Sequence, residues 1–337
     1  MLSSFTINSR RYLGNKTKLL PFILDTVVKN CKNIESVADI FAGTGSVASA
    51  FVDKVIYTND ILKSNYICNL AWFSPKEYSK TKVESILNEF NNYNTTESNY
   101  MKDNFANTYF SAKVCSKIGF IRENIENLSK NGEINERETS ILITSLLYAM
   151  DKIATTCGHY DSYRKGAKLA DGINLAMPRL YDNLNQNNHC FNKDANELVR
   201  EIYADLVYID PPYNSRQYSD TYHLLENVAT WQKPQVFGVA KKMDRSAIKS
   251  KYCNSTANEA FNDLITNINA RYILLSYNNM ATKGNDRSNA RINDEIIMQT
   301  LSKKGKVSIF SQDYKAFSAG KSSIKDNSER LFLCKCR

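Results

Sequence analysis

Short apolar runs that alternate with polar turns set the pattern of this chain. Residues 206–209 are continuously apolar, which is typical of a strand buried on both faces of a parallel sheet, and the two prolines that follow must end it because they lack a backbone N–H. Further strands are predicted at residues 36–41, 55–60, 272–277, 306–310 and 331–334. Helices are predicted from near Val47 and at residues 134–153, 221–231 and 294–302. The pattern predicts an α/β core.

A segment without the alternating strand and helix pattern separates the first two predicted strands from the later ones. Residues 91–96 form a polar loop, whereas residues 134–153 have the pattern of a long capped helix. We therefore predict one domain built from residues 1–62 and 189–337, with a mostly helical region inserted at residues 63–188.

The four residues after the central apolar run suit chemistry on the amino group of a nucleobase. That nitrogen is a weak nucleophile because its lone pair is delocalised into the ring. Two acceptors aimed at its hydrogens, such as the Asp210 side chain and the Pro211 carbonyl, would draw it toward sp³ geometry, and Tyr213 could stack on a base taken out of the duplex. The alternative is a strand end with an ordinary Pro-Pro turn at Pro211 and Pro212, so a methyl-donor site elsewhere in the chain decides between the two.

A glycine-rich turn after the first predicted strand supplies such a site. Gly43 and Gly45 allow a ligand to approach the backbone, and the helix expected from near Val47 favours a negative group at its N-terminus. The turn also fits a dinucleotide fingerprint, except that Ala48 stands where a third glycine is expected. Asp60 ends the next strand, where an acid takes the ribose hydroxyls of a bound adenosine, so we expect an adenosyl ligand.

Three motifs, taken in their order along the chain, resemble those of the Dam-type adenine-specific DNA methyltransferases. They are an aromatic-x-Gly-x-Lys segment at residues 12–16, Asp-x-Phe-x-Gly-x-Gly at residues 39–45 and Asp-Pro-Pro-Tyr at residues 210–213. The resemblance covers residues 9–60 and 189–231 well. It implies a Rossmann-like S-adenosylmethionine-dependent methyltransferase sheet with an inserted DNA-recognition region, and the role of a restriction-modification methylase.

The same resemblance implies which residues form the site. The catalytic residues would be Asp210, Pro211, Pro212 and Tyr213. The residues that bind S-adenosylmethionine would be Tyr12, Gly14, Lys16, Asp39, Phe41, Gly43, Gly45, Asp60, Asp194 and Asp210. Among these, Asp60 corresponds to the acid that binds the ribose and Asp194 to the acid near the adenine ring.

Candidate DNA contacts lie in two places. Residues 155–166 combine turn residues with His159, Arg164 and Lys165, which can read guanine edges or hold phosphates, although a solvated loop is the alternative. Arg216 and Tyr218 follow the catalytic motif directly, where a target strand must pass.

Flanking segments yield two further interpretations. The basic stretches at residues 241–245 and 249–251 are interpreted as part of a DNA-facing surface. His223 and Glu226 fall on the helix after the catalytic motif, and we interpret them as buried packing residues.

Composition agrees with these expectations. A formal net charge of +9 and a pI near 9.0 indicate a polyanionic partner, and 20 tyrosines provide side chains for stacking. The eight cysteines are scattered apart from Cys334 and Cys336, so we expect reduced thiols and no metal site. No signal peptide or membrane-length apolar run is evident, and we expect a cytoplasmic protein.

The sequence thus predicts an S-adenosylmethionine-dependent methyltransferase acting on the adenine amino group of double-stranded DNA, with a cognate restriction endonuclease as a separate protein. The alternatives are methylation of a cytosine amino group, an RNA base or a protein glutamine, and a non-catalytic DNA-binding module.

Overall fold

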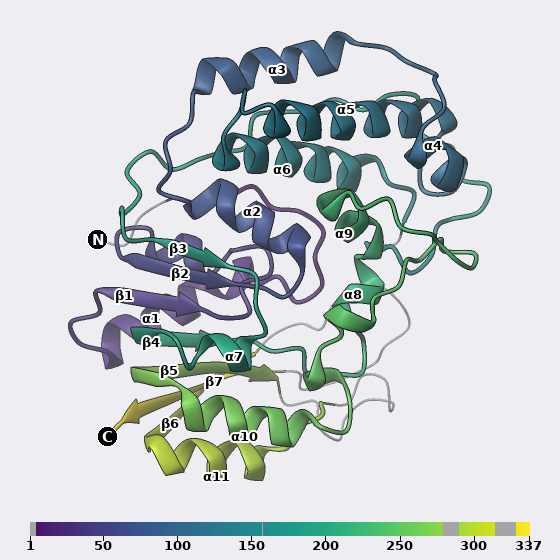
Figure 1. Ribbon diagram of the computed structural model, residues 1–337. Helices are drawn as coiled ribbons and strands as arrows, with labels where there is room; N and C mark the ends of the chain where they lie inside the picture. The colour runs from purple at the N-terminus through teal and green to yellow at the C-terminus, as the bar shows by residue number, and fades with distance from the viewer. Residues whose placement is uncertain (1–4, 157, 279–289, 314–327) are drawn as a thin grey trace.

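A single twisted sheet organises the chain, whose computed structural model describes residues 5–156, 158–278, 290–313 and 328–337 (Figure 1). Its seven strands follow the order β3-β2-β1-β4-β5-β7-β6. Neighbouring strands are parallel from β3 to β5, and β7 is antiparallel to both β5 and β6. The strands are β1 (Ser36–Asp39), β2 (Val55–Asn59), β3 (His189–Phe191), β4 (Tyr203–Ile209), β5 (Asn269–Asn278), β6 (Gly305–Asp313) and β7 (Ser328–Cys336). The predicted α/β core is confirmed, and the strands predicted at residues 306–310 and 331–334 are present as parts of β6 and β7, which pair with each other.

Helices cover both faces of the sheet. The helix α1 packs on one face through residues such as Ile23, whereas α7, α10 and α11 pack on the other. The α-helices are α1 (Leu20–Asn30), α2 (Lys63–Phe73), α3 (Lys80–Asn92), α4 (Tyr100–Phe105), α5 (Ala112–Lys130), α6 (Glu136–Ile153), α7 (Ala195–Leu198), α8 (Tyr218–Thr221), α9 (His223–Thr230), α10 (Ala257–Asn267) and α11 (Asp294–Lys304). Short 3-10 helices are η1 (Thr17–Leu19), η2 (Ala48–Phe51), η3 (Ser246–Ile248) and η4 (Lys251–Cys253).

Two predicted helices differ from the structure. The helix expected from near Val47 is only the 3-10 helix η2, because the chain turns back after Phe51 to enter β2. The helix expected at residues 221–231 is divided at Tyr222, whose backbone (φ −117°, ψ 22°) is not helical, and it ends at Trp231, which is left-handed with φ +51°. The predicted long helix at residues 134–153 is confirmed as α6, which Asn135 and Glu138 cap reciprocally.

The helical segment packs directly on the sheet. One apolar cluster contains Ile56 of β2, Trp72 of α2 and Leu146 of α6, and it also includes residues of α5 and α9. In Figure 1 the helices α3, α5 and α6 stack beyond α2, on the side away from β4. The helix α2 therefore connects strands β2 and β3 to the helices that follow it in the helical segment.

Strand register brings two acids to the same edge of the sheet. Asp39, at the end of β1, pairs with Tyr208 of β4, and Asp210 follows two residues later. Because β1 and β4 are parallel, both carboxylates leave the sheet at its carboxyl edge, where open α/β sheets bind ligands.

Buried polar residues attach α9 to its neighbours. Glu226 is 2% exposed and accepts hydrogen bonds from the backbone N–H groups of Lys63 and Ser64, both at 2.8 Å, at the start of α2. His223 is fully buried, with Nε2 2.9 Å from the carbonyl oxygen of Tyr160. The prediction that His223 and Glu226 are buried packing residues is confirmed, and Glu226 also supplies the cap that α2 lacks locally.

Replacing Glu226 by alanine leaves two buried backbone donors without an acceptor. We expect Glu226→Ala to lower the free energy of unfolding by about 2–3 kcal/mol, from the usual worth of hydrogen bonds to a charged group. Urea unfolding followed by circular dichroism measures the change. Glu259→Ala, at an exposed position of α10, is the control and should stay within about 0.5 kcal/mol of the wild-type protein. Equal stability of the two variants would show that α2 does not depend on this cap.

Candidate active site

A cavity opens at the carboxyl ends of β1, β2 and β4. It is lined by residues from the N-terminal segment, the glycine turn, the ends of these strands and the segments that follow Asp210. The residues predicted from the sequence that line it are Tyr12, Gly14, Lys16, Asp39, Phe41, Gly43, Asp60, Asp194, Asp210, Pro212 and Tyr218. Segments nearly two hundred residues apart thus meet in one place.

The glycine turn fits closely against its neighbours. Gly43 has φ +52°, and a Cβ placed on it would lie 3.2 Å from the Tyr12 ring. Gly45 has φ +80°, and its Cβ would come within 2.5 Å of Oδ1 of Asn69 on α2. Gly45 does not line the cavity. It is therefore required by packing against α2, whereas Gly43 lies on the cavity wall.

Asp60 holds this turn in place. Its carboxylate accepts hydrogen bonds from Gly43 N at 2.9 Å, Leu62 N at 2.8 Å and Asn65 Nδ2 at 3.1 Å. Burial raises the pKa of Asp60 to about 6, although these amide donors oppose the shift. The acid thus orders the turn as well as facing the cavity.

Asp39 lies at the floor of the cavity as a nearly isolated carboxylate. It is 1% exposed, and neither oxygen accepts a hydrogen bond from the described residues. Burial and the neighbouring Asp210 raise the pKa of Asp39 to about 8, although the backbone amides of Ala48 and Phe41 face it without reaching hydrogen-bond geometry and moderate the shift. Its charge is therefore unfavourable until a cation or a donor approaches.

Asp210 is paired with Lys16. The Nζ of Lys16 lies 3.1 Å from Oδ1 of Asp210, and the lysine side chain is 5% exposed. Burial raises the pKa of Asp210 to about 6, opposed by Lys16 and assisted by Glu329. Burial alone would lower the pKa of Lys16, but the charges of Asp210 and Glu329 hold it well above its usual value. Lys16 is therefore charged and fixes the orientation of the Asp210 carboxylate.

Of the rest of the Asp-Pro-Pro-Tyr motif, Pro212 lines the cavity, whereas Pro211 and Tyr213 are not among its lining residues. Pro211 is buried. The half-buried Tyr213 packs edge-to-face against Tyr277 of β5, with ring centroids 6.0 Å apart, and its carbonyl oxygen accepts a hydrogen bond from Arg291 N at 2.8 Å. The Tyr213 ring is thus supported on one side by the sheet.

Three tyrosines form a stack along the wall of the cavity. The ring centroid of Tyr12 lies 4.6 Å from the ring centroid of Tyr222 and 5.4 Å from that of Tyr218. The hydroxyl of Tyr218 donates to the carbonyl oxygen of Leu13 at 3.1 Å, so the side chain predicted to contact DNA belongs to this wall. The stack joins the N-terminal segment to α8 and α9.

Sequence reasoning missed the buried Arg10. Its guanidinium donates to Asn65 Oδ1 at 2.6 Å, lies 3.8 Å from Asp151 of α6 and sits over the Tyr12 ring, 5.2 Å from the centroid. Arg10 therefore links the N-terminal segment to α2 and α6. Arg10 lies beside the aromatic-x-Gly-x-Lys segment, but a single arginine carries no pattern that marks it as buried.

The loop at residues 158–166 lies beside α8. The backbone N–H of Tyr160 donates to the carbonyl oxygen of Thr221 at 2.8 Å, and Nδ1 of His159 lies 3.6 Å from Asp161. Burial lowers the pKa of His159, although Asp161 opposes the shift. His159 is therefore half-buried beside Asp161, while Arg164 and Lys165 are exposed farther along the loop.

Several cations interpreted from the sequence as part of a DNA-facing surface form ion pairs within the protein. Lys242 lies 2.8 Å from Asp161, Arg245 lies 2.6 Å from Asp220, and Lys251 lies 3.4 Å from Asp194. Lys251, Tyr252 and Gln217 line the cavity, which no motif had indicated.

Three further observations concern metal-ligating side chains, membrane-spanning helices and cysteines. Within the described ranges, no group of three or more metal-ligating side chains is present, and no helix is long and apolar enough to cross a membrane. The cysteines of the same ranges are free, Cys334 and Cys336 included, while Cys157 lies outside them.

Comparison with known proteins gives a consistent result. Residues 12–285 match the model of the D12 class N6 adenine-specific DNA methyltransferases. The chain is 38% identical to the modification methylase StsI of Streptococcus sanguinis, over 80% of this chain and 44% of that protein. It is 30% identical to the modification methylase LlaI of Lactococcus lactis subsp. lactis, over 95% of this chain and 53% of that protein.

A third relative matches end to end. The type II methyltransferase M.NlaIII of Neisseria lactamica is 28% identical over 94% of this chain and 95% of its own length. The chain therefore spans about half the length of StsI and LlaI and nearly all of M.NlaIII. The matched region contains the glycine turn, the Lys16–Asp210 pair and the Asp-Pro-Pro-Tyr motif, and on this match the chain belongs to the D12 class N6 adenine-specific DNA methyltransferase family.

Proposed function

We propose that this chain transfers a methyl group from S-adenosylmethionine to the exocyclic amino nitrogen of an adenine flipped out of double-stranded DNA. The observation that carries the proposal is the Lys16–Asp210 pair at the end of β4, which fixes a buried acceptor in the same cavity as the glycine turn. The family supports adenine as the base and DNA as the substrate.

The cavity fits S-adenosylmethionine by charge. That molecule carries a sulfonium and an ammonium group, and the cavity presents the carboxylates of Asp39, Asp60, Asp194 and Asp210. Asp39, buried without a hydrogen-bond partner among the described residues, is the acceptor that such a cation would satisfy. Asp60 would hold the ribose and Asp194 the adenine end.

The walls of the cavity complete the fit. Tyr12, Lys16, Phe41 and Gly43 border it. Gly14 and Gly45 shape the backbone around it, since both have positive φ and lie against side chains that a Cβ would meet.

In the reaction, S-adenosylmethionine supplies an electrophilic methyl group. Asp210 and the carbonyl of Pro211 accept the two amino hydrogens of the target base, which localises the lone pair of the nitrogen. As that nitrogen forms its bond to the methyl carbon, the carbon–sulfur bond breaks, and the nitrogen then releases a proton. Asp210, with a pKa raised to about 6, is the base at hand for this proton, and Tyr213 stacks on the flipped ring.

The helical segment at residues 63–188 is proposed as the target-recognition region of a catalytic domain formed by residues 1–62 and 189–337. His159, Arg164 and Lys165 would contact the DNA from its loop, and Arg216 with Tyr218 would act beside the flipped base. The loop lies against α8 through Tyr160 and Thr221, which supports a common DNA-binding face.

Relatives named as modification methylases support a role in restriction-modification. We propose that a separate restriction endonuclease is the cognate partner and that the chain acts in the cytoplasm, on cellular DNA.

Long-read sequencing of DNA from cells that express the chain tests the proposed reaction. We expect N6-methyladenine at one sequence context, and Asp210→Ala should lower the methylation rate of that site about 100-fold or more, because an oriented acceptor in the transition state is lost. Tyr213→Ala should also lose transfer while retaining S-adenosylmethionine binding by calorimetry. Methylation by both variants at the wild-type rate would overturn the mechanism.

Asp39→Asn tests the charge of the cavity. The pKa of Asp39 is raised in the folded protein, so the folded state holds a proton that the unfolded state has released, and stability falls as pH rises from about 4 to about 8. The cofactor-free variant should therefore be more stable than wild type by about 1 kcal/mol or more at pH 8, with a smaller difference at pH 5.5.

Urea unfolding at the two pH values measures this difference, and calorimetry should show weaker S-adenosylmethionine binding by the same variant. A pH-independent loss of stability would mean that Asp39 is satisfied without a ligand.

Base reading and strand handling should separate by mutation. Arg164→Ala or Lys165→Ala should relax discrimination by roughly 1–3 kcal/mol for each base-edge contact, whereas Arg216→Ala should slow cognate and near-cognate sites alike. Single-turnover methylation of a duplex and its single-base variants, at fixed salt, measures both effects. If only Arg216→Ala alters discrimination, recognition lies beside the catalytic loop.

A further inference from the structure

A segment that follows the catalytic motif closes one side of the cavity. Ile248, Ser250, Lys251 and Tyr252 all line it, although they lie about forty residues beyond Asp210 in the sequence. We call residues 248–253 the wall segment. The wall segment contacts two parts of the site: the start of α7 beside Asp194, and the loop at residues 214–217 that follows the catalytic motif.

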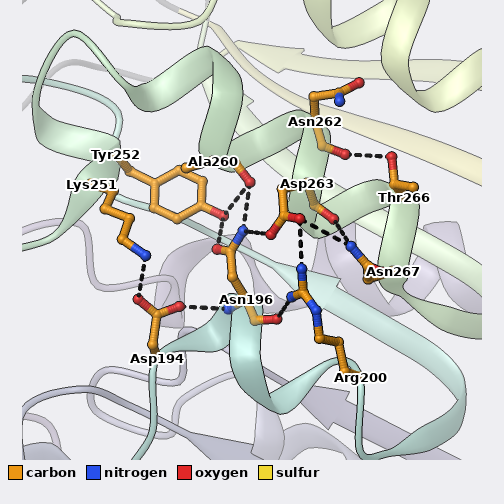
Figure 2. A network of polar contacts seen from close by, with 10 residues as sticks. All are labelled: Asp194, Asn196, Arg200, Lys251, Tyr252, Ala260, Asn262, Asp263, Thr266 and Asn267. Carbon is orange, nitrogen blue, oxygen red and sulfur yellow. Dashed lines mark hydrogen bonds and ion pairs between the residues drawn. The ribbon is translucent and has the colours of Figure 1, made fainter.

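Tyr252 anchors the wall segment to the helices α7 and α10, which pack on one face of the sheet. Tyr252 is 4% exposed, and its hydroxyl donates to Asn196 Oδ1 at 2.8 Å (Figure 2). Asn196 in turn donates to the carbonyl oxygen of Ala260 and to Asp263, both at 2.8 Å. Arg200 lies 2.6 Å from Asp263. The tyrosine ring is thus fixed to α7 and α10.

Lys251 and Tyr252 line the same part of the cavity as Asp194. Lys251 Nζ is 3.4 Å from Asp194 Oδ2, as Figure 2 shows. The ring of Tyr252 meets Phe41 edge-to-face, with centroids 5.2 Å apart and an interplanar angle of 83°. Tyr252, Phe41 and Asp194 therefore surround the end of the cavity that would hold the adenine of the cofactor.

The wall segment is also clasped to the loop after the catalytic motif, through Ser250 and Cys253, which flank Lys251 and Tyr252 in the sequence. Gln217 Nε2 donates to the carbonyl oxygen of Ser250 at 2.9 Å, and Ser250 N donates to Gln217 Oε1 at 2.8 Å. The thiol of Cys253 lies 3.4 Å from the carbonyl oxygen of Arg216. Gln217 is thus bound to the backbone of the wall segment through both polar atoms of its amide.

We propose that Gln217 is a positioning residue that couples cofactor binding to the placement of residues 214–217, the loop that receives the target strand. The clasp fixes this loop to a segment that is itself fixed around the adenine end of the cavity. A cofactor that orders the wall segment therefore also orders Arg216, which precedes Gln217, and raises the affinity for DNA. The inference rests on the proposed function.

The test measures coupling directly. A duplex that bears the site identified by sequencing is titrated into the protein with and without saturating S-adenosylhomocysteine, and the ratio of the two DNA dissociation constants is the coupling factor. By linkage, the same factor must appear when S-adenosylhomocysteine is titrated with and without the duplex. We expect a factor of about fivefold or more for the wild-type protein.

Gln217→Met removes both hydrogen bonds while nearly preserving the size of the side chain. Its coupling factor should fall to within about twofold of one, because either ligand then binds without ordering the region of the other. The matched control is Gln232→Met, the same substitution at an exposed position outside the cavity, and its coupling factor should stay at the wild-type value. A side chain with a merely structural role would change stability and leave the coupling factor unchanged.

Two results would overturn the inference: a wild-type coupling factor of one, or a Gln217→Met variant that keeps the wild-type factor. Thermal unfolding of each variant checks that it is folded, and Gln217→Leu replaces Gln217→Met if that variant is not. Failure of the proposed function gives a different result, because a protein that binds no S-adenosylhomocysteine or methylates no DNA yields no coupling factor for any variant.

Discussion

The burial of several carboxylates at one edge of the sheet is the constraint on which the site depends. Parallel strands β1, β2 and β4 end together, so Asp39, Asp60 and Asp210 are brought close in surroundings that disfavour their charges. Lys16 offsets part of this cost at Asp210, and backbone amides do so at Asp60. Asp39 has no cationic partner, and the backbone amides of Ala48 and Phe41 only moderate its shift without forming hydrogen bonds, so most of the remaining unfavourable charge is concentrated at this position. A cationic ligand gains the most where the protein has left this charge uncompensated.

The fold supports that arrangement from outside the sheet. The N-terminal segment carries Lys16 into the cavity, and its position depends on Arg10, which is buried between Asn65 of α2 and Asp151 of α6. Tyr12 completes the connection by stacking on Tyr222 of the segment that follows the catalytic motif. The helical segment therefore contributes to the arrangement of the cavity, because its α6 holds Arg10 of the N-terminal segment that carries Lys16.

The central strands and the acids at their ends could be predicted because both follow local rules. Continuous apolar runs mark buried parallel strands, and a polar residue directly after such a run must lie at the carboxyl edge, as Asp60 and Asp210 do. The helix expected from near Val47 was wrong because the glycine turn has the local signals of a helix start, but the short connection to β2 leaves room only for η2. Lys251 is exposed, as the sequence indicated, but its pairing with Asp194 could not be predicted because the two residues are far apart in the sequence.

What the sequence could not indicate are the contacts made by single residues with no pattern of their own. Gln217 and Ser250 are thirty-three positions apart and are joined through a backbone amide and carbonyl, which any residue type could offer at the second position. Tyr252 is one of 20 tyrosines, and only its burial against Phe41 and Asn196 distinguishes it. Motifs mark residues whose chemistry restricts their identity, whereas the geometry that holds a reactive loop beside a ligand is built from ordinary side chains. The region after the catalytic motif therefore contributes to the cavity, and under the proposed function the surfaces for the cofactor and for DNA would share one piece of backbone.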